Sequence, residues 1–124
     1  HKEEDQMIKL FETWRVDLIV LAGYMRVLKN PAAFPAPIIN IHPSLLPKYK
    51  GLHAIEQALD SGDDVTGVSV HYVNEELDGG EIILQQEVPI LPNDNIDSLT
   101  KAIQRIEYGI LPAAIEHVKH QLQK

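Results

Sequence analysis

The chain has 124 residues, of which 44% are hydrophobic and 23% are charged, and this profile predicts one soluble globular domain. Eighteen acidic residues outnumber eleven basic ones, so the formal charge of -7 argues against nucleic acid as a partner. The lack of cysteine excludes disulfides and thiolate chemistry and fits a cytoplasmic protein, and the longest apolar run, 18–22, is too short to cross a membrane.

The first segments predict a helix followed by two buried strands. Apolar residues recur at helical spacing and predict an amphipathic helix over about 3–15: Met7, Leu10, Phe11 and Trp14. The short apolar run 17–22 predicts a parallel strand that is buried on both faces. After a proline-rich loop over 31–37, the run 38–42 predicts a second buried strand that ends in polar residues.

The rest of the chain continues this alternation. Four elements are predicted before the last helix: a constrained loop over 43–51, a short helix over 54–59, a strand with two unlike faces over 66–73, and a strand over 81–90. Cap residues 93–95 begin the last helix, whose apolar stripe predicts a core position: Leu99, Ile103, Ile106 and Ile110. Pro112 predicts either a kink or a second helix.

This order of elements predicts an α/β fold, with an open, mainly parallel twisted sheet and helices on both faces. The first predicted element is a helix with no strand before it. We therefore expect the amino-terminal strands of the sheet to be missing from the chain.

Polar residues lie near the end of the predicted strand 38–42, where ligands of open α/β sheets collect. Asn40 and His42 are two residues apart, so both side chains leave the strand on one side, as an amide donor and an imidazole. Alternatively, the pair hydrogen-bonds backbone groups of the neighbouring loop. Asp78 lies in a Leu-Asp-Gly-Gly segment and is either a simple turn residue or a functional carboxylate. Close to His42, it would favour an imidazolium that stabilises a developing oxyanion.

The remaining histidines have weaker functional signals. His71 lies beside Ser69 on the polar face of its strand, and points either into the same cleft or toward a neighbouring loop. His53 begins a helix and is interpreted as structural. His117 and His120 have a spacing compatible with a metal, but no third ligand is indicated, so a metal enzyme is disfavoured. The chain contains neither a dinucleotide nor a triphosphate glycine motif, nor the glycine-flanked serine of a nucleophile elbow.

Long, ordered motifs resemble the glycinamide ribonucleotide transformylase family over nearly the whole chain. They are LAGYMRVL at 21–28, NIHPSLLPKY at 40–49, GLHA at 51–54, VHYV at 70–73 and ELDGG at 76–80. The resemblance implies a Rossmann-like formyltransferase fold. It also implies the transfer of a formyl group from 10-formyltetrahydrofolate to the amine of glycinamide ribonucleotide, a step of purine biosynthesis.

The resemblance also assigns catalytic roles by position. Asn40 would hydrogen-bond the formyl oxygen, His42 would stabilise the oxyanion, and Asp78 would keep His42 charged and assist proton movement. Direct attack of an amine on the formyl carbon forms no covalent enzyme intermediate, which fits the lack of a nucleophile motif. No metal is required.

Further site residues follow from the same resemblance. The folate pocket would be lined by Met25, Arg26, Leu28, Asn74, Glu75, Glu76, Leu77 and Asp78. The ribonucleotide would contact Asn40, Gln104 and Glu107, and the reaction centre would be supported by Ser69 and His71.

The sequence departs from the family pattern at its start, because family members begin with a strand and a glycine- and serine-rich loop that binds the substrate phosphate. We therefore expect residues 1–124 to be the carboxyl-terminal part of the catalytic domain, with the triad and most of the folate pocket. Without the phosphate loop, weak ribonucleotide binding and slow turnover are expected, and an unpaired sheet edge invites a homodimer.

Two other interpretations stay open. One is a different 10-formyltetrahydrofolate enzyme: a hydrolase, a sugar-nucleotide formyltransferase, or the enzyme that formylates initiator transfer RNA, which the charge of -7 argues against. The other is a catalytically silent folate-binding fragment whose triad is inherited but unused.

Overall fold

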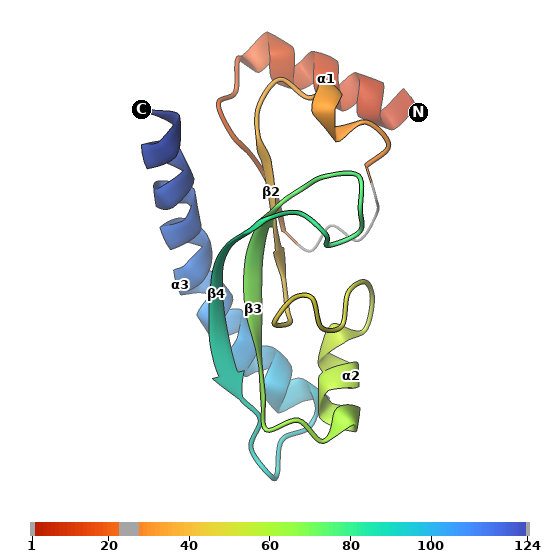
Figure 1. Cartoon of the computed structure of the whole chain (residues 1–124), viewed down its shortest axis with the longest axis vertical. Helices are drawn as coiled ribbons and strands as arrows, with labels where there is room; N and C mark the ends of the chain where they lie inside the picture. Colours follow the sequence, from red (N-terminus) through yellow and green to blue (C-terminus); the bar gives the residue numbers. More distant parts are fainter. Residues whose placement is uncertain (1, 23–27, 124) are drawn as a thin grey trace.

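The computed structural model describes residues 2–22 and 28–123, which build helices around a single sheet (Figure 1). The helical elements of these ranges are α1 (Lys2–Trp14), the short 3-10 helix η1 (Pro31–Ala33), α2 (Ala54–Ser61) and α3 (Ile96–Leu122). The strands are β1 (Ile19–Ala22), β2 (Ile38–His42), β3 (Val65–Tyr72) and β4 (Ile82–Pro89). The predicted helices and strands are therefore confirmed in type and order.

The four described strands lie in the order β1-β2-β3-β4. The predicted open α/β sheet is confirmed, and its parallel pair is β1 with β2, whereas β3 runs antiparallel to both β2 and β4. A parallel crossover from β2 to β3 would need a connection that returns along the sheet. The eight-residue α2 lies beyond the end of β2 instead, so β3 starts where β2 ends and runs back beside it (Figure 1).

The two faces of the sheet are covered by different elements. α3 covers one face, and the buried residues there form the main core: Ile39, Ile41, Val68, Val70, Val88, Leu99, Ile103, Ile110, Ala114 and Val118. A smaller cluster on the other side joins the sheet to η1 and α1, and its buried members are Ile19, Leu28, Phe34 and Ile38. Because side chains alternate along a strand, Asn40 and His42 share the face of Ile38, away from α3.

Three sequence expectations differ from the structure. β1 is buried on only one face, since Val20 is 38% exposed and β1 is an edge strand among the described residues. The inner side of α1 is formed by Met7, Ile8 and Phe11, whereas Leu10 and Trp14 are exposed, because α1 contacts only the small cluster. α3 continues through Pro112 as one helix, so a second helix starting there is wrong.

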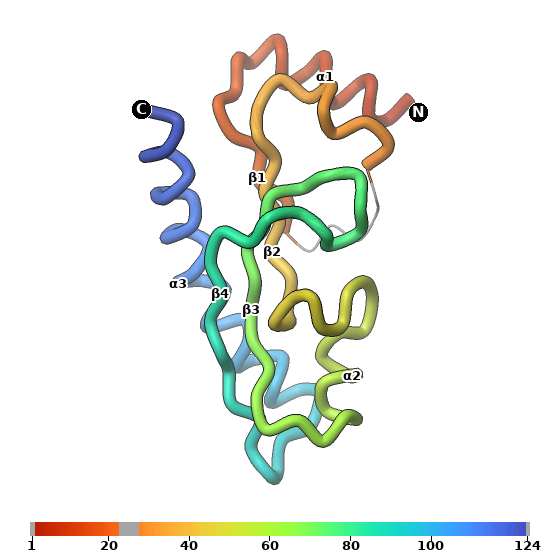
Figure 2. The backbone as a smooth tube through the Cα atoms, viewed as in Figure 1, coloured from red at the N-terminus to blue at the C-terminus, as the bar shows by residue number. Residues whose placement is uncertain are grey.

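The loop after β3 folds back toward the start of β2. The backbone trace shows residues 73–81 beside the segment that leads into β2 (Figure 2). The amide of Val73 donates to the carbonyl of Ile38 at 2.8 Å, which fixes the loop there. This return brings Asp78 to the face of the sheet that carries His42.

Candidate active site

The pairing of β2 with β3 places four polar residues on one face of the sheet. Asn40 lies opposite His71, and His42 lies opposite Ser69. Directly opposed residues of an antiparallel pair point to the same side, so these four side chains share one small volume. All four are at most 4% exposed. Buried polar side chains need partners, and those partners come from two loops.

Asp78 joins this group from the loop between β3 and β4. Its Oδ2 lies 3.5 Å from Nδ1 of His42, and its Oδ1 lies 3.5 Å from Nε2 of His71. The amide of Gly51 donates to Oδ2 at 2.8 Å. Asp78 has a φ of +50°, a left-handed backbone conformation that aspartate tolerates better than most residues. The structure thus places Asp78 close to His42, which the sequence left open, and His71 faces the same carboxylate.

The partners of His42 suit a positively charged ring. Its Nε2 lies 2.8 Å from the carbonyl oxygen of Tyr49, which can only accept, so Nε2 carries a proton. Its Nδ1 faces the carboxylate of Asp78. Both ring nitrogens therefore face acceptors. The result is a buried, oriented imidazole beside a carboxylate.

Asn40 and His71 are oriented by backbone groups. Oδ1 of Asn40 accepts from the amide of Ile41 at 2.9 Å, which fixes the amide nitrogen as the donor end of the side chain. Nδ1 of His71 donates to the carbonyl of Tyr72 at 2.9 Å, which directs Nε2 toward Asp78. The alternative of bonding to the neighbouring loop is therefore correct for His42, which contacts Tyr49, whereas Asn40 bonds the backbone of Ile41 within β2. Both contacts coexist with the cluster around Asp78.

Ser69 ties the segment after β2 to the sheet. Its hydroxyl donates to the carbonyl of Ser44 at 2.7 Å and accepts from the amide of Leu46 at 3.0 Å. Gln85 lies opposite Ser69 on β4, and its side-chain nitrogen donates to the same hydroxyl at 2.8 Å. Sequence reasoning missed Gln85, although its place opposite Ser69 in paired strands is the signal that identifies it.

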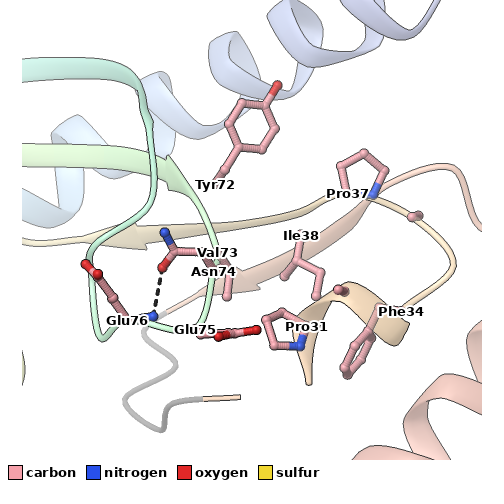
Figure 3. A pocket seen from close by; sticks show the side chains of 11 residues that line it. Pro31, Phe34, Pro37, Ile38, Tyr72, Val73, Asn74, Glu75 and Glu76 are labelled. Atoms are coloured by element: carbon pink, nitrogen blue, oxygen red, sulfur yellow. Dashed lines mark hydrogen bonds between the residues drawn. The ribbon is translucent and has the colours of Figure 1, made fainter. Parts of the chain in front are cut away.

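A pocket of about 530 Å³ lies at the end of the sheet where β2 begins and β3 ends. Figure 3 shows Asn74, Glu75 and Glu76 on one side of it, and apolar residues of the 31–38 segment on the other. The amide of Glu76 donates to Oδ1 of Asn74 at 2.8 Å, which shapes this rim (Figure 3). Ile38 lines the pocket and lies two residues before Asn40 on the same face of β2, a spacing of about 7 Å along the strand.

The structure places the predicted folate residues in different parts of the fold. Asn74, Glu75 and Glu76 line the pocket. Leu28 is 2% exposed and belongs to the small apolar cluster, Leu77 is half-buried in the loop, and Asp78 belongs to the histidine cluster. Met25 and Arg26 lie outside the described residues. The apolar wall that sequence reasoning missed is formed by Pro31, Phe34, Pro37 and Ile38, a stretch interpreted mainly as loop.

The two remaining predicted residues line a second pocket of about 290 Å³. Gln104 and Glu107 on α3 face Pro43 and Gly51 across it. Burial raises the pKa of Glu107 above its ordinary value. Ile41, on the opposite face of β2, lines this pocket, and so does Gly51, whose amide donates to Asp78.

The remaining histidines lie outside the cluster around Asp78. His53 precedes α2 with an exposed side chain 3.5 Å from Glu56, and both of these residues line the second pocket. His117 and His120 are exposed on α3. Among residues 2–22 and 28–123, no group of three or more histidine or acidic residues is placed to hold a metal ion. No helix in the described part of the chain is both long and apolar enough to cross a membrane.

Comparison with known proteins gives a consistent set of matches. The formyl transferase family model matches residues 1–115. The phosphoribosylglycinamide formyltransferase of Haemophilus influenzae is 47% identical over 115 residues, which are 91% of this chain and 54% of that protein. The Escherichia coli enzyme of that name is 46% identical over 113 residues, 89% of this chain and 53% of the relative. The chain thus spans about half the length of these curated relatives.

The solved structures agree with the sequence matches. The crystal structure of phosphoribosylglycinamide formyltransferase from Bacillus halodurans superposes with a TM-score of 0.89 at 43% identity. The match covers 95% of this chain and 63% of that structure. The fold of the described residues is therefore that of a solved enzyme that is considerably longer.

Proposed function

Because this chain belongs to the formyl transferase family, we propose that it transfers a formyl group from 10-formyltetrahydrofolate to the amine of glycinamide ribonucleotide. The observation that carries the proposal is the buried cluster of Asn40, His42 and Asp78 on the sheet face that Ile38 shares, and Ile38 lines a pocket. The cluster offers an amide donor and an oriented imidazolium. These are the groups that a developing oxyanion needs.

The reaction begins when the amine nitrogen of the ribonucleotide attacks the formyl carbon. A carbon–nitrogen bond forms, and the electrons of the formyl double bond move to its oxygen. The amide nitrogen of Asn40 donates a hydrogen bond to this oxyanion. His42 stabilises it through its charge, because both of its ring nitrogens already face protein acceptors. These groups are in place before the reaction, so they need no reorganisation as the charge develops.

The second step releases tetrahydrofolate. The oxyanion electrons restore the carbon–oxygen double bond, and the bond between the formyl carbon and N10 of the folate breaks. The proton of the attacking amine moves to N10, and Asp78 assists by holding the charge of His42 and the proton path in place. The two steps form no covalent bond between the enzyme and the formyl group.

The two pockets provide places for the two substrates. We assign the folate to the pocket beside Ile38, where the apolar wall suits the pterin and the rim of Asn74 to Glu76 offers backbone and acidic acceptors. We assign part of the ribonucleotide to the pocket with Gln104 and Glu107, whose polar side chains suit hydroxyl groups. His71 and Ser69 support the centre by orienting Asp78 and the segment after β2.

The assay measures formyl transfer by the full 124-residue chain. It is run alone and with the unmatched part of the Haemophilus influenzae relative supplied in trans. We expect transfer in at least one arm and at least a 100-fold loss in the His42→Ala variant. Release of formate that does not depend on glycinamide ribonucleotide would indicate a hydrolase instead. A folded chain that transfers nothing in either arm contradicts the proposal.

Two further parts of the proposal concern the cellular location and the oligomeric state of the protein. The cysteine-free composition supports the cytoplasm as its place of action. A homodimer stays a prediction, supported by the edge position of β1 among the described strands. Sedimentation of a single monomeric species at high concentration would contradict it.

A further inference from the structure

Residues Lys48–Gly51, called here the clamp loop, supply a backbone contact to each member of the charged pair. The carbonyl of Tyr49 accepts from Nε2 of His42 at 2.8 Å. Two residues later, the amide of Gly51 donates to Oδ2 of Asp78 at 2.8 Å. His42 and Asp78 lie 36 positions apart in the sequence. The clamp loop therefore holds the relative position of two residues that come from different parts of the chain.

The backbone of the clamp loop is not in a relaxed conformation. Tyr49 has a φ of +54°, in the left-handed region that tyrosine rarely adopts. Gly51 has a φ of +83°, which glycine adopts without strain. A strained residue such as Tyr49 persists only where surrounding contacts fix it, so an external anchor is required.

That anchor is Asp63, in the turn between α2 and β3. The hydroxyl of Tyr49 donates to Oδ2 of Asp63 at 2.7 Å, and Nζ of Lys48 lies 3.3 Å from the same oxygen. The hydroxyl of Ser61 accepts from the amide of Asp63 at 3.1 Å, which fixes the turn itself. The hydrogen bond from Tyr49, followed by that from Lys48, lowers the pKa of Asp63, so its carboxylate is ionised at neutral pH.

We propose that Asp63 is a positioning residue, which holds Tyr49 and Lys48 so that the clamp loop keeps His42 and Asp78 aligned. The hydrogen-bond partners of the Asp63 carboxylate are Tyr49 and Lys48, not His42 or Asp78, and Asp63 lines neither pocket described above. Its effect passes through the phenol of Tyr49 to the carbonyl of the same residue. The catalytic consequence of this positioning rests on the proposed function, whereas the positioning itself does not.

The first test follows the ring of His42 by nitrogen-15 NMR in the full chain. The readout is the exchange rate of the Nε2 proton with water, which reports opening of the bond to Tyr49. We expect Asp63→Ala and Tyr49→Phe each to raise this rate at least 10-fold. Asp63→Asn, which keeps an acceptor for the phenol, is expected to change it less. Asp64→Ala is the matched control, because Asp64 is the adjacent exposed aspartate.

The second readout is formyl transfer in the arm that turns over. Asp63→Ala and Tyr49→Phe are each expected to lower kcat about 10-fold and to leave KM for the folate within about 2-fold of the unmodified value. The double variant is expected to have the same kcat as either single variant, because the two residues act as one unit. Circular dichroism checks that each variant is folded, and Tyr49→Phe keeps the test valid if Asp63→Ala unfolds.

The outcomes separate the two proposals. If Asp63→Ala exchanges like Asp64→Ala, or if Tyr49→Phe exchanges like the unmodified chain, the positioning role is wrong. If both variants accelerate exchange but the unmodified chain transfers no formyl group, the positioning role stands and the proposed function fails.

Discussion

The charge of Asp78 can be removed with little change of shape by Asp78→Asn. Asparagine tolerates the left-handed φ of +50° at this position. Its Oδ1 can still accept from the amide of Gly51, which now donates to Oδ2 at 2.8 Å. The substitution therefore isolates the negative charge that faces His42.

The structure sets the size of the effect. At 3.5 Å between Nδ1 of His42 and Oδ2 of Asp78, and with an effective dielectric constant of about 20, unit charges attract by about 5 kcal/mol. The cost of burying the pair offsets part of this attraction. If about half of it reaches the transition state, the loss of about 2.5 kcal/mol corresponds to roughly a 70-fold lower rate. We therefore expect kcat/KM to fall about 70-fold.

Formyl transfer to glycinamide ribonucleotide measures this loss, and Glu81→Gln serves as the control. Glu81 is an exposed carboxylate three residues beyond Asp78, and its substitution is expected to leave kcat/KM unchanged. Urea unfolding establishes that Asp78→Asn is folded under assay conditions. A folded Asp78→Asn variant that keeps kcat/KM within 3-fold of the unmodified chain refutes the charge-based role of Asp78.

Two further predictions concern stability. Ser69→Ala leaves the buried amide of Leu46 without its acceptor and should lower the free energy of unfolding by about 1–3 kcal/mol. Thr66→Val removes a hydroxyl that has no partner among the described residues, so it should not lower this free energy. Equal losses for the two variants in urea titrations would contradict the prediction. Because burial raises the pKa of Glu107, the folded chain holds an extra proton above about pH 4.5, so stability falls as pH rises through the folded-state pKa. Glu107→Gln should therefore be more stable than the unmodified chain at pH 8 but not at pH 4. The control Glu116→Gln, at an exposed position, should show no such difference between the two pH values. A gain in stability of Glu107→Gln that does not depend on pH would argue against this explanation.

Strand patterns predicted the part of the site that lies on the sheet. The alternation in each strand placed Asn40 with His42, and Ser69 with His71, on one face of their own strand, because that alternation is a local property. Only the pairing of β2 with β3 shows that the two faces are the same. The direction of β3 could not be predicted in this way. It depends on whether the connection that contains α2 returns along the sheet, which is decided by packing rather than by the pattern of residues.

The contacts made by loops were the least predictable part. The carbonyl of Tyr49 and the amide of Gly51 are backbone groups, so the residue types at these positions do not indicate what they bind. Asp78 looked like a turn residue, and it is one, but its turn also carries the carboxylate to His42. Such contacts join residues that are distant along the chain, and only the folded loops bring them together.

The strand β2 has a function on each of its faces, and this constrains how the protein can evolve. Ile39 and Ile41 belong to the core beneath α3, whereas Asn40 and His42 point to the proposed reaction centre. Inserting or deleting one residue in β2 would turn the polar pair into the core and the isoleucines into the site. The length of β2 is therefore fixed, and changes in substrate preference are expected in the loops around it, where insertions leave the strand register unchanged.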